Sequence, residues 1–282
     1  MQKLPTDPQL ALQLPSIPLG LSSGPPSYRS GVLTSRSFAS VIPEVSGAAA
    51  GDLEDLLPPE SFLETLARPL VRDIWCACII RPTSGKLWST GFSLFTPGQR
   101  TVLWAEKKKT GLYVIHGVSN SGALTPLAEV RKSVNGSDYS MTVYANDSRH
   151  QNRETLALNF NSQCTYEQRK LRHVSVRIPC VDSPQPGGVI LSARKPKDPD
   201  THGVETLISA APILDPLTKK YVLRFRSQQI KHSSSRNVQL TRETEPESVV
   251  MELGKMDAKS FSLNFSYPLS PIQAFAISLS LL

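Results

Sequence analysis

The chain has 282 residues, of which 39% are hydrophobic and 20% are charged, and its formal net charge is +7. This composition is sufficient for one sizeable domain with a hydrophobic core. No run of about 18 apolar residues occurs, so no transmembrane helix is predicted, and the N-terminus lacks the basic and apolar pattern of a signal peptide. The four cysteines form no CxxC pair and no cluster with zinc-ligand spacing. We interpret them as reduced thiols of a cytosolic or nuclear protein and predict no metal or cofactor.

The first 72 residues differ in character from the rest of the chain. Of the first 50 positions, 20 are Pro, Ser or Gly and no periodicity is present, so residues 1–51 are predicted to be a disordered Pro- and Ser-rich segment. Residues 52–72 are richer in leucine and acidic side chains. Ser61 can begin a short helix there, which Pro69 would end. We therefore predict a short helical lead-in over 52–72 and a domain over 73–282.

Beyond Arg72 the pattern is typical of β-strands. Residues 260–267 alternate most clearly, because Phe261 and every second residue after it are apolar or aromatic while the intervening residues are polar. Similar short segments occur at 91–95, 101–105, 112–116, 139–144, 156–160, 173–178, 221–226, 237–240 and 249–253. No helical pattern separates them. About ten strands with short polar breaks indicate a mainly β fold, an antiparallel sandwich or barrel.

The last segment, residues 270–282, has the signals of a helix. Ser270 is a suitable N-cap, Pro271 occupies the first helical position and Gln273 completes a capping box. The positions that follow are apolar on every side, broken only by Ser278 and Ser280. A helix of about 12 residues is about 18 Å long, which is too short to span a bilayer. We favour a core helix that fills a closed barrel over a membrane anchor or a groove-binding peptide.

Three stretches carry a resemblance to a known family. FSLNFSYPLSPIQAFAISLS (261–280) is similar to the C-terminal signature of the tubby family. YVLRF (221–225) with RNVQL (236–240) resembles its strand pair, and VLWAEKKK (102–109) resembles an apolar strand that runs into a basic cluster. The resemblance covers about residues 73–282 and implies a closed antiparallel barrel of about 12 strands around a central buried C-terminal helix. The shorter lysine cluster and the irregular insert at 183–203 resemble the divergent branch whose long members carry WD40 repeats and a SOCS box.

Basic residues are the candidate site. Residues 100–180 contain 12 Lys and Arg against 6 Asp and Glu. The resemblance implies that Lys107, Lys108 and Lys109, together with Arg131 and Lys132, bind the headgroup of phosphatidylinositol 4,5-bisphosphate. Adjacent ammonium groups can surround a polyphosphorylated headgroup, and an arginine can add bidentate contact. The alternative is a solvated turn whose lysines only keep the protein soluble.

Other functions have less support in the sequence. Arg224, Arg226 and Arg236 form a second basic set, in which Arg224 and Arg226 share the outward face of a predicted strand. We interpret the set as solvated arginines rather than as a headgroup or nucleic-acid contact. The histidines are scattered, no catalytic motif occurs, and we predict no catalytic residues and no enzyme. The function expected is a phosphoinositide-binding module, cytoplasmic and peripheral at the plasma membrane, with the nucleus left open. The alternative is an adaptor that binds a protein partner or ubiquitin ligase components. A nucleic-acid-binding regulator is less favoured, because no stacking aromatic pattern and no groove-reading helix stand out.

Overall fold

The computed structural model describes residues 50–51, 62–84, 90–144, 153–161, 165–166, 169–170, 173–181, 203–219 and 221–282. Almost all of the segment predicted to be disordered, 1–51, lies outside the described residues, as does most of the insert at 183–203. A helix, α1 (Phe62–Leu66), falls within the predicted lead-in. The limits of the lead-in and of the domain stay predictions.

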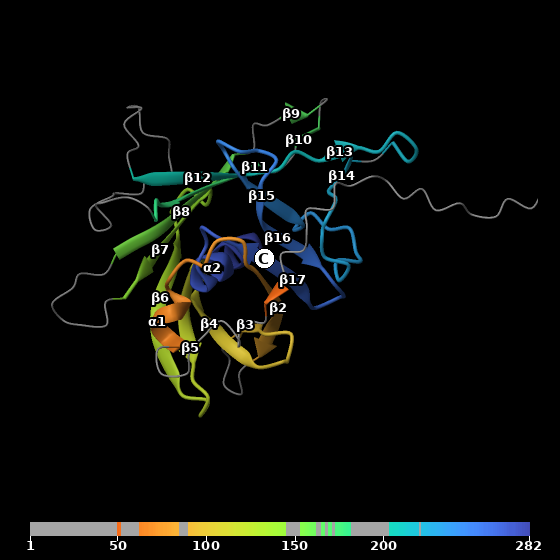
Figure 1. Ribbon diagram of the computed structural model, residues 1–282. Helices are drawn as coiled ribbons and strands as arrows, with labels where there is room; N and C mark the ends of the chain where they lie inside the picture. The colour runs from red at the N-terminus through yellow and green to blue at the C-terminus, as the bar shows by residue number, and fades with distance from the viewer. Residues whose placement is uncertain are drawn as a thin grey trace, which may run out of the picture. The chain divides into compact units, whose positions relative to one another are not determined.

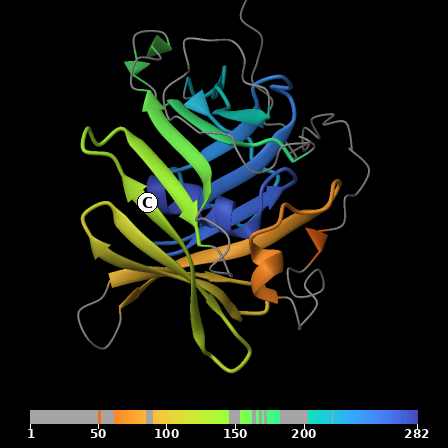
Figure 2. The ribbon, with the colours of Figure 1, turned by 90° about the vertical axis from the view of Figure 1, so that its left-hand side faces the viewer.

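Twelve of the described strands form a closed ring (Figures 1 and 2). In chain order they are β2 (Trp75–Ser84), β3 (Thr90–Phe95), β4 (Thr101–Lys109), β5 (Leu112–Val118), β6 (Leu124–Lys132), β7 (Asp138–Val143), β8 (Arg153–Asn161), β11 (His173–Pro179), β12 (Val204–Ser209), β15 (Val238–Arg242), β16 (Val249–Lys255) and β17 (Phe261–Ser266). Around the ring the order is β2-β17-β16-β15-β12-β11-β8-β7-β6-β5-β4-β3, and β3 pairs with β2 to close it. All of these pairings are antiparallel. The mainly β, closed antiparallel barrel is therefore confirmed.

Short strands lie outside this ring. β1 (Ala50–Gly51) pairs in parallel with the beginning of β2. β9 (Thr165–Tyr166) and β10 (Arg169–Lys170) form one two-stranded sheet, and β13 (Ile213–Leu214) and β14 (Tyr221–Val222) form another. Figure 1 shows β13 and β14 beside β15, outside the ring of strands.

The C-terminal helix α2 (Pro271–Leu281) lies inside the barrel, as predicted (Figure 2). Every residue of α2 is buried, and the inward side chains of the strands pack around it in one continuous core. The predicted capping box is present. The Ser270 hydroxyl accepts a hydrogen bond from the Gln273 backbone N–H, and the Gln273 side-chain oxygen accepts one from the Ser270 N–H. The helix is thus a core element that is surrounded by strands.

Polar side chains of α2 are satisfied within the barrel. The hydroxyls of Ser278 and Ser280 donate to the carbonyls of Ala274 and Ala276, one turn earlier, at 2.8 and 3.0 Å. Gln273 Nε2 also donates to the carbonyl of Thr155 in β8, at 2.9 Å. Because buried hydroxyls and amides without partners are costly, these bonds explain how polar residues occupy a wholly buried helix.

Two strand predictions need correction. The segment 221–226 is not one long strand: β14 ends at Val222, and the residues after it lie across the outside of β15 and β16. There the Gln239 side chain donates to the Arg224 carbonyl and the Arg226 N–H donates to Glu252. The strand predicted at 101–105 continues through Lys109 as β4. In addition, β2, β6 and β12 were not among the predicted strands.

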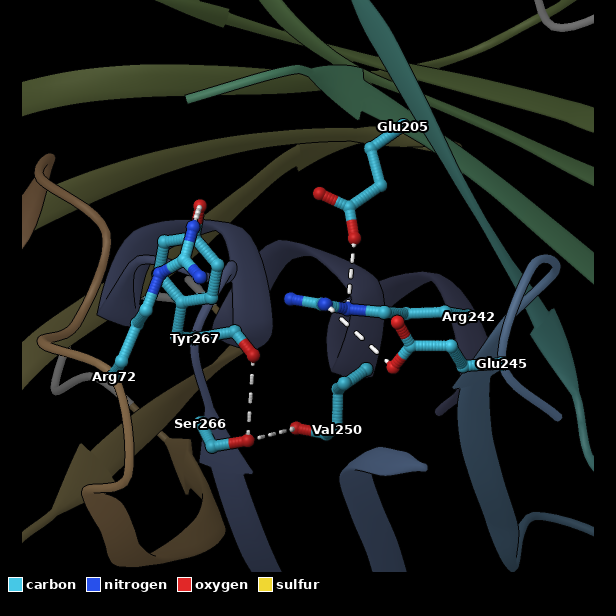
Figure 3. Close-up of polar contacts among 7 residues, drawn as sticks. All are labelled: Arg72, Glu205, Arg242, Glu245, Val250, Ser266 and Tyr267. Atoms are coloured by element: carbon cyan, nitrogen blue, oxygen red, sulfur yellow. Dashed lines mark hydrogen bonds and ion pairs between the residues drawn. The ribbon is translucent and has the colours of Figure 1, made fainter. Parts of the chain in front are cut away.

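The lead-in contacts the corner that precedes α2. Leu66 and Leu70 are buried in the core, and the Leu70 N–H donates to the Leu269 carbonyl at 3.1 Å. Figure 3 shows two arginines around Tyr267 at this corner. The guanidinium carbons of Arg72 and Arg242 lie 4.8 and 5.4 Å from the centre of the Tyr267 ring, over which both are placed. Such cation–π contacts tie the chain before β2 to the entry of the core helix.

Candidate functional site

Basic residues from distant parts of the chain meet at the end of the β4–β5 hairpin. A two-residue turn, Thr110 and Gly111, joins the strands, and Gly111 has the positive φ of 79° that this turn requires. Lys109 is then paired with Leu112, and Leu112 is paired with Arg131 of β6. Neighbouring strands are about 4.8 Å apart, so the backbones of Lys109 and Arg131 are about 10 Å apart on the same face. The structure therefore brings the two predicted basic sets together.

The five predicted residues do not share one face. Lys107 is paired with Tyr113, which is buried among the core residues, and its ammonium lies 6.0 Å from the centre of that ring. Lys132 is paired with Tyr139, with its ammonium 5.6 Å from that ring. Because paired residues point to the same side of a sheet, Lys107 and Lys132 lie on the inward side at the barrel end. Burial raises the pKa of Tyr113, and neighbouring Tyr139 raises it further.

The outward side carries Lys108, Lys109 and Arg131. A register shift between Lys107 and Lys109 makes Lys108 the extra residue of the strand, and such a bulge re-aims its side chain. The Lys108 ammonium lies 2.7 Å from Glu106 Oε2, and the Arg131 guanidinium lies 2.8 Å from Glu129 Oε1. The cations remain accessible: 48% of the Lys108 side chain and 63% of the Arg131 side chain are exposed, against 19% and 25% for the two glutamates.

The glutamates belong to a row that the sequence interpretation missed. Glu106 and Glu129 are both paired with Val114 of β5, and Thr142 of β7 is paired in turn with Glu129 and Glu154. Burial raises the pKa of Glu154. The sequence contained a signal for this row, because Glu106 and Glu129 each precede a predicted basic residue by two positions and residues two apart share one face of a strand. An outward row of carboxylates therefore lies directly beside the outward row of cations.

His116 lies behind this ion pair. Its Nε2 is 3.9 Å from Glu106 Oε2, its ring is 5.1 Å from that of Trp104, and neither ring nitrogen has a hydrogen-bond partner within the described residues. Burial lowers the pKa of His116; the Glu106 charge opposes this shift, and Lys108 adds to it. A neutral imidazole carries no charge to pair with Glu106, so Lys108 is the cation that forms the ion pair with this carboxylate.

The described residues contain no group of three or more His, Cys, Asp or Glu side chains that could hold a metal ion. Among the same residues, no helix combines the length and apolar character that crossing a membrane requires. Arg224 and Arg226, predicted on one outward strand face, lie outside regular strands, as does Arg236. The Arg226 guanidinium lies over the Trp75 ring at 4.9 Å.

The protein is a closed antiparallel β-barrel of twelve strands that surrounds a buried C-terminal helix and carries a basic row at one end. The model of the Tub family matches residues 66–282, and the chain belongs to this family. The prediction from the C-terminal residues is thus confirmed at the level of the family.

Relatives match over shorter lengths. The chain is 35% identical over 105 residues to protein king tubby of Drosophila pseudoobscura pseudoobscura, an alignment that covers 37% of this chain and 22% of that protein. It is 33% identical over 86 residues to tubby protein homolog 1 of Caenorhabditis briggsae, covering 30% of this chain and 20% of that protein. The matched region thus spans about a fifth of the relatives' length. A solved structure of an Arabidopsis thaliana protein is similar with a TM-score of 0.30 and 11% identity, covering 80% of this chain and 94% of that chain.

Proposed function

We propose that this chain is a non-catalytic module that binds a phosphoinositide headgroup, of which phosphatidylinositol 4,5-bisphosphate is the candidate, and so tethers the protein or its cargo to membranes. The site is the outward face at the end of β4, β5 and β6. Lys108 and Lys109 would act as point charges, while the Arg131 guanidinium can bind a phosphate through two parallel hydrogen bonds. The proposal also implies a peripheral location at the cytoplasmic leaflet, where anionic lipids are concentrated.

One observation carries this proposal: strand pairing places Lys109 and Arg131 on one face across Leu112, although 22 positions separate them in sequence. A solvated lysine turn would not need a second basic residue in register. The exposure of the Lys108 and Arg131 side chains adds support, because a membrane-bound phosphate can reach both. Membership of the Tub family is consistent with this role.

The experiment compares two double variants of the full chain in liposome co-sedimentation at about 0.15 M salt. Lys108→Ala with Arg131→Ala removes two outward cations. Lys107→Ala with Lys132→Ala removes the same charge from the inward side of the same strands. Vesicles contain either phosphatidylserine alone or phosphatidylserine with phosphatidylinositol 4,5-bisphosphate at equal total charge.

We expect wild-type binding to require the bisphosphate. Because each basic residue near an anionic leaflet contributes about 1 kcal/mol, the outward variant should bind roughly 30-fold more weakly. Because Lys107 and Lys132 lie on the inward side, the inward variant should lose clearly less affinity than the outward variant. Equal losses in both variants, or binding that follows vesicle charge alone, would contradict a defined headgroup site. The adaptor function, binding to a protein partner or ubiquitin ligase components, would then be the explanation to test.

A further inference from the structure

A pocket of about 560 Å³ lies on another part of the barrel, between the β13–β14 sheet and the segment that precedes β15. This volume lies in the range of specific binding sites. The lining contains both apolar and polar side chains. The apolar side chains are Tyr221, Val222, Leu223, Phe225 and Ile230, all partly buried, and the polar ones include Ser233, Ser234, Ser235 and His232.

The wall of this pocket is held firmly against the barrel. Gln239 Nε2 donates to the Arg224 carbonyl at 2.7 Å, and the Arg226 N–H donates to Glu252 Oε1 at 3.1 Å. Ile230 packs so closely on Gly254 of β16 that a Cβ there would lie 2.5 Å from its side chain. Because several independent contacts fix the wall, the pocket is a preformed feature, and binding to it costs little ordering of the chain.

The rim of the pocket is strongly basic. Residues 209–238 contain six Lys and Arg and a single acidic residue, Asp215. Lys231 lines the pocket, Arg224 and Arg236 are exposed next to residues that line it, and Lys219 is exposed two positions before Tyr221. The Asp215 carboxylate accepts hydrogen bonds from the Thr218 hydroxyl at 2.6 Å and from the Leu217 N–H at 3.0 Å. These hydrogen bonds, together with the weaker influence of the Arg224 charge, lower the pKa of Asp215, so the rim holds one carboxylate among several cations.

Apolar side chains also project beside the pocket. The exposed fractions are 56% for Ile213, 40% for Leu214 and 91% for Leu217. Together with the half-buried lining they form an apolar surface, and such surfaces with a polar or charged rim mark interaction sites. Apolar anchors in a pocket supply most of the affinity of an interface, while rim charges select the partner and speed association.

We propose that this pocket binds a short acidic segment of a protein partner, with one or two large apolar side chains inserted between Phe225 and Ile230 and with carboxylates placed against Lys231 and Arg236. The position favours a protein over a membrane. In the ring of twelve strands β15 stands six strands from β5 in either direction, so the pocket lies opposite the outward face of β4–β6. Only the preference for a protein over a membrane rests on the proposed lipid site; the pocket itself shares no residue with that site.

The test uses the full chain and a phage library of random 12-residue peptides. Selection on the wild type should enrich peptides that combine acidic residues with an aromatic or leucine anchor. One enriched peptide, labelled with fluorescein, is then titrated with three variants in a fluorescence polarisation assay. Lys231→Glu with Arg236→Glu reverses the rim, and Ala210→Trp fills the pocket without a change of charge. Arg68→Glu with Lys259→Glu makes the same charge change at two exposed positions elsewhere.

The reversed rim and the filled pocket should each weaken binding at least tenfold, whereas the control should bind like the wild type. A version of the peptide with lysine in place of its acidic residues should prefer the reversed rim over the wild type. No enrichment of acidic peptides, or equal weakening by the control, would overturn the proposal. Loss of phosphoinositide vesicle binding in the reversed-rim variant, with peptide binding unchanged, would also overturn it and assign the pocket to lipid. Failure of the headgroup proposal alone would leave the peptide result intact.

Discussion

Removal of the two carboxylates beside the outward cations should strengthen phosphoinositide binding. Glu106 lies 2.7 Å from the Lys108 ammonium and Glu129 lies 2.8 Å from the Arg131 guanidinium. A phosphate must therefore compete with each glutamate for its cation. Glu106→Gln combined with Glu129→Gln keeps the size of both side chains and removes only their charges.

The magnitude follows from the exposure of the pairs. Both cations are about half exposed or more, and ion pairs at such positions contribute about 0.2–1 kcal/mol each. At the upper end, two such pairs amount to about 2 kcal/mol. In the variant, a phosphate no longer has to break these pairs to bind either cation. We therefore expect an affinity increase of up to roughly 30-fold, which should shrink as salt is raised.

The assay is titration of the variant with vesicles that contain phosphatidylinositol 4,5-bisphosphate. Glu64→Gln combined with Glu245→Gln is the control, because both residues also pair with arginines but lie on other elements. The control should bind like the wild type. Unchanged or weaker binding after the change at Glu106 and Glu129 would show that Lys108 and Arg131 do not hold the phosphate. An equal gain in the control would show that only net charge matters.

Two further predictions concern stability. Phe275 is completely buried in α2, so Phe275→Ala should lower the free energy of unfolding by about 3–5 kcal/mol and the melting temperature by roughly 6–20 °C in thermal denaturation. Val134 is fully exposed, so the control Val134→Ala should have little effect. A melting temperature of Phe275→Ala within about 2–3 °C of the wild type would contradict a core role. Burial lowers the pKa of His116 below its ordinary value of 6.5. As the pH is lowered, His116 therefore takes up a proton at a higher pH in the unfolded chain than in the folded chain, and the free energy of unfolding should fall below about pH 6.5. Urea denaturation at pH 7.5 and 5.5 should show a smaller loss for His116→Gln, and an equal loss in both proteins would exclude His116 as the source.

The parts of the fold that were predictable are those with strong local signals. Ser270, Pro271 and Gln273 specify the start of α2 through their own side chains, so the helix could be located without knowledge of its surroundings. By contrast, β2 was not predicted because Trp75 and Ala77 on its outward side are as apolar as Cys76 and Cys78 on its inward side. That strand has no polar alternation to recognise.

The candidate site was predictable in composition but not in geometry. The lysine cluster and Arg131 were identifiable as basic residues, and the resemblance supplied their role. Which of them share a face depends on the bulge at Lys108 and on the register of β5 against β6, and neither is encoded in one short segment. The ion pairs of Glu106 with Lys108 and of Glu129 with Arg131 were not predicted for the same reason, because contacts on one strand face can be recognised only when the strand is known to continue through the lysines.

The position of α2 after every strand has a consequence for the order of folding. The residues that fill the core are synthesised only after all twelve ring strands, and β2, the first of these, must pair with β17, about 185 positions later. Contacts over such separations are slow to form, because the entropy cost of closing a long loop comes before the contacts contribute favourable free energy. While α2 is absent, the apolar inner faces of the strands have nothing to pack against. The nascent chain therefore remains prone to aggregation until α2, which follows all twelve ring strands, is available to pack, and chaperone protection should be most important just before α2 leaves the ribosome.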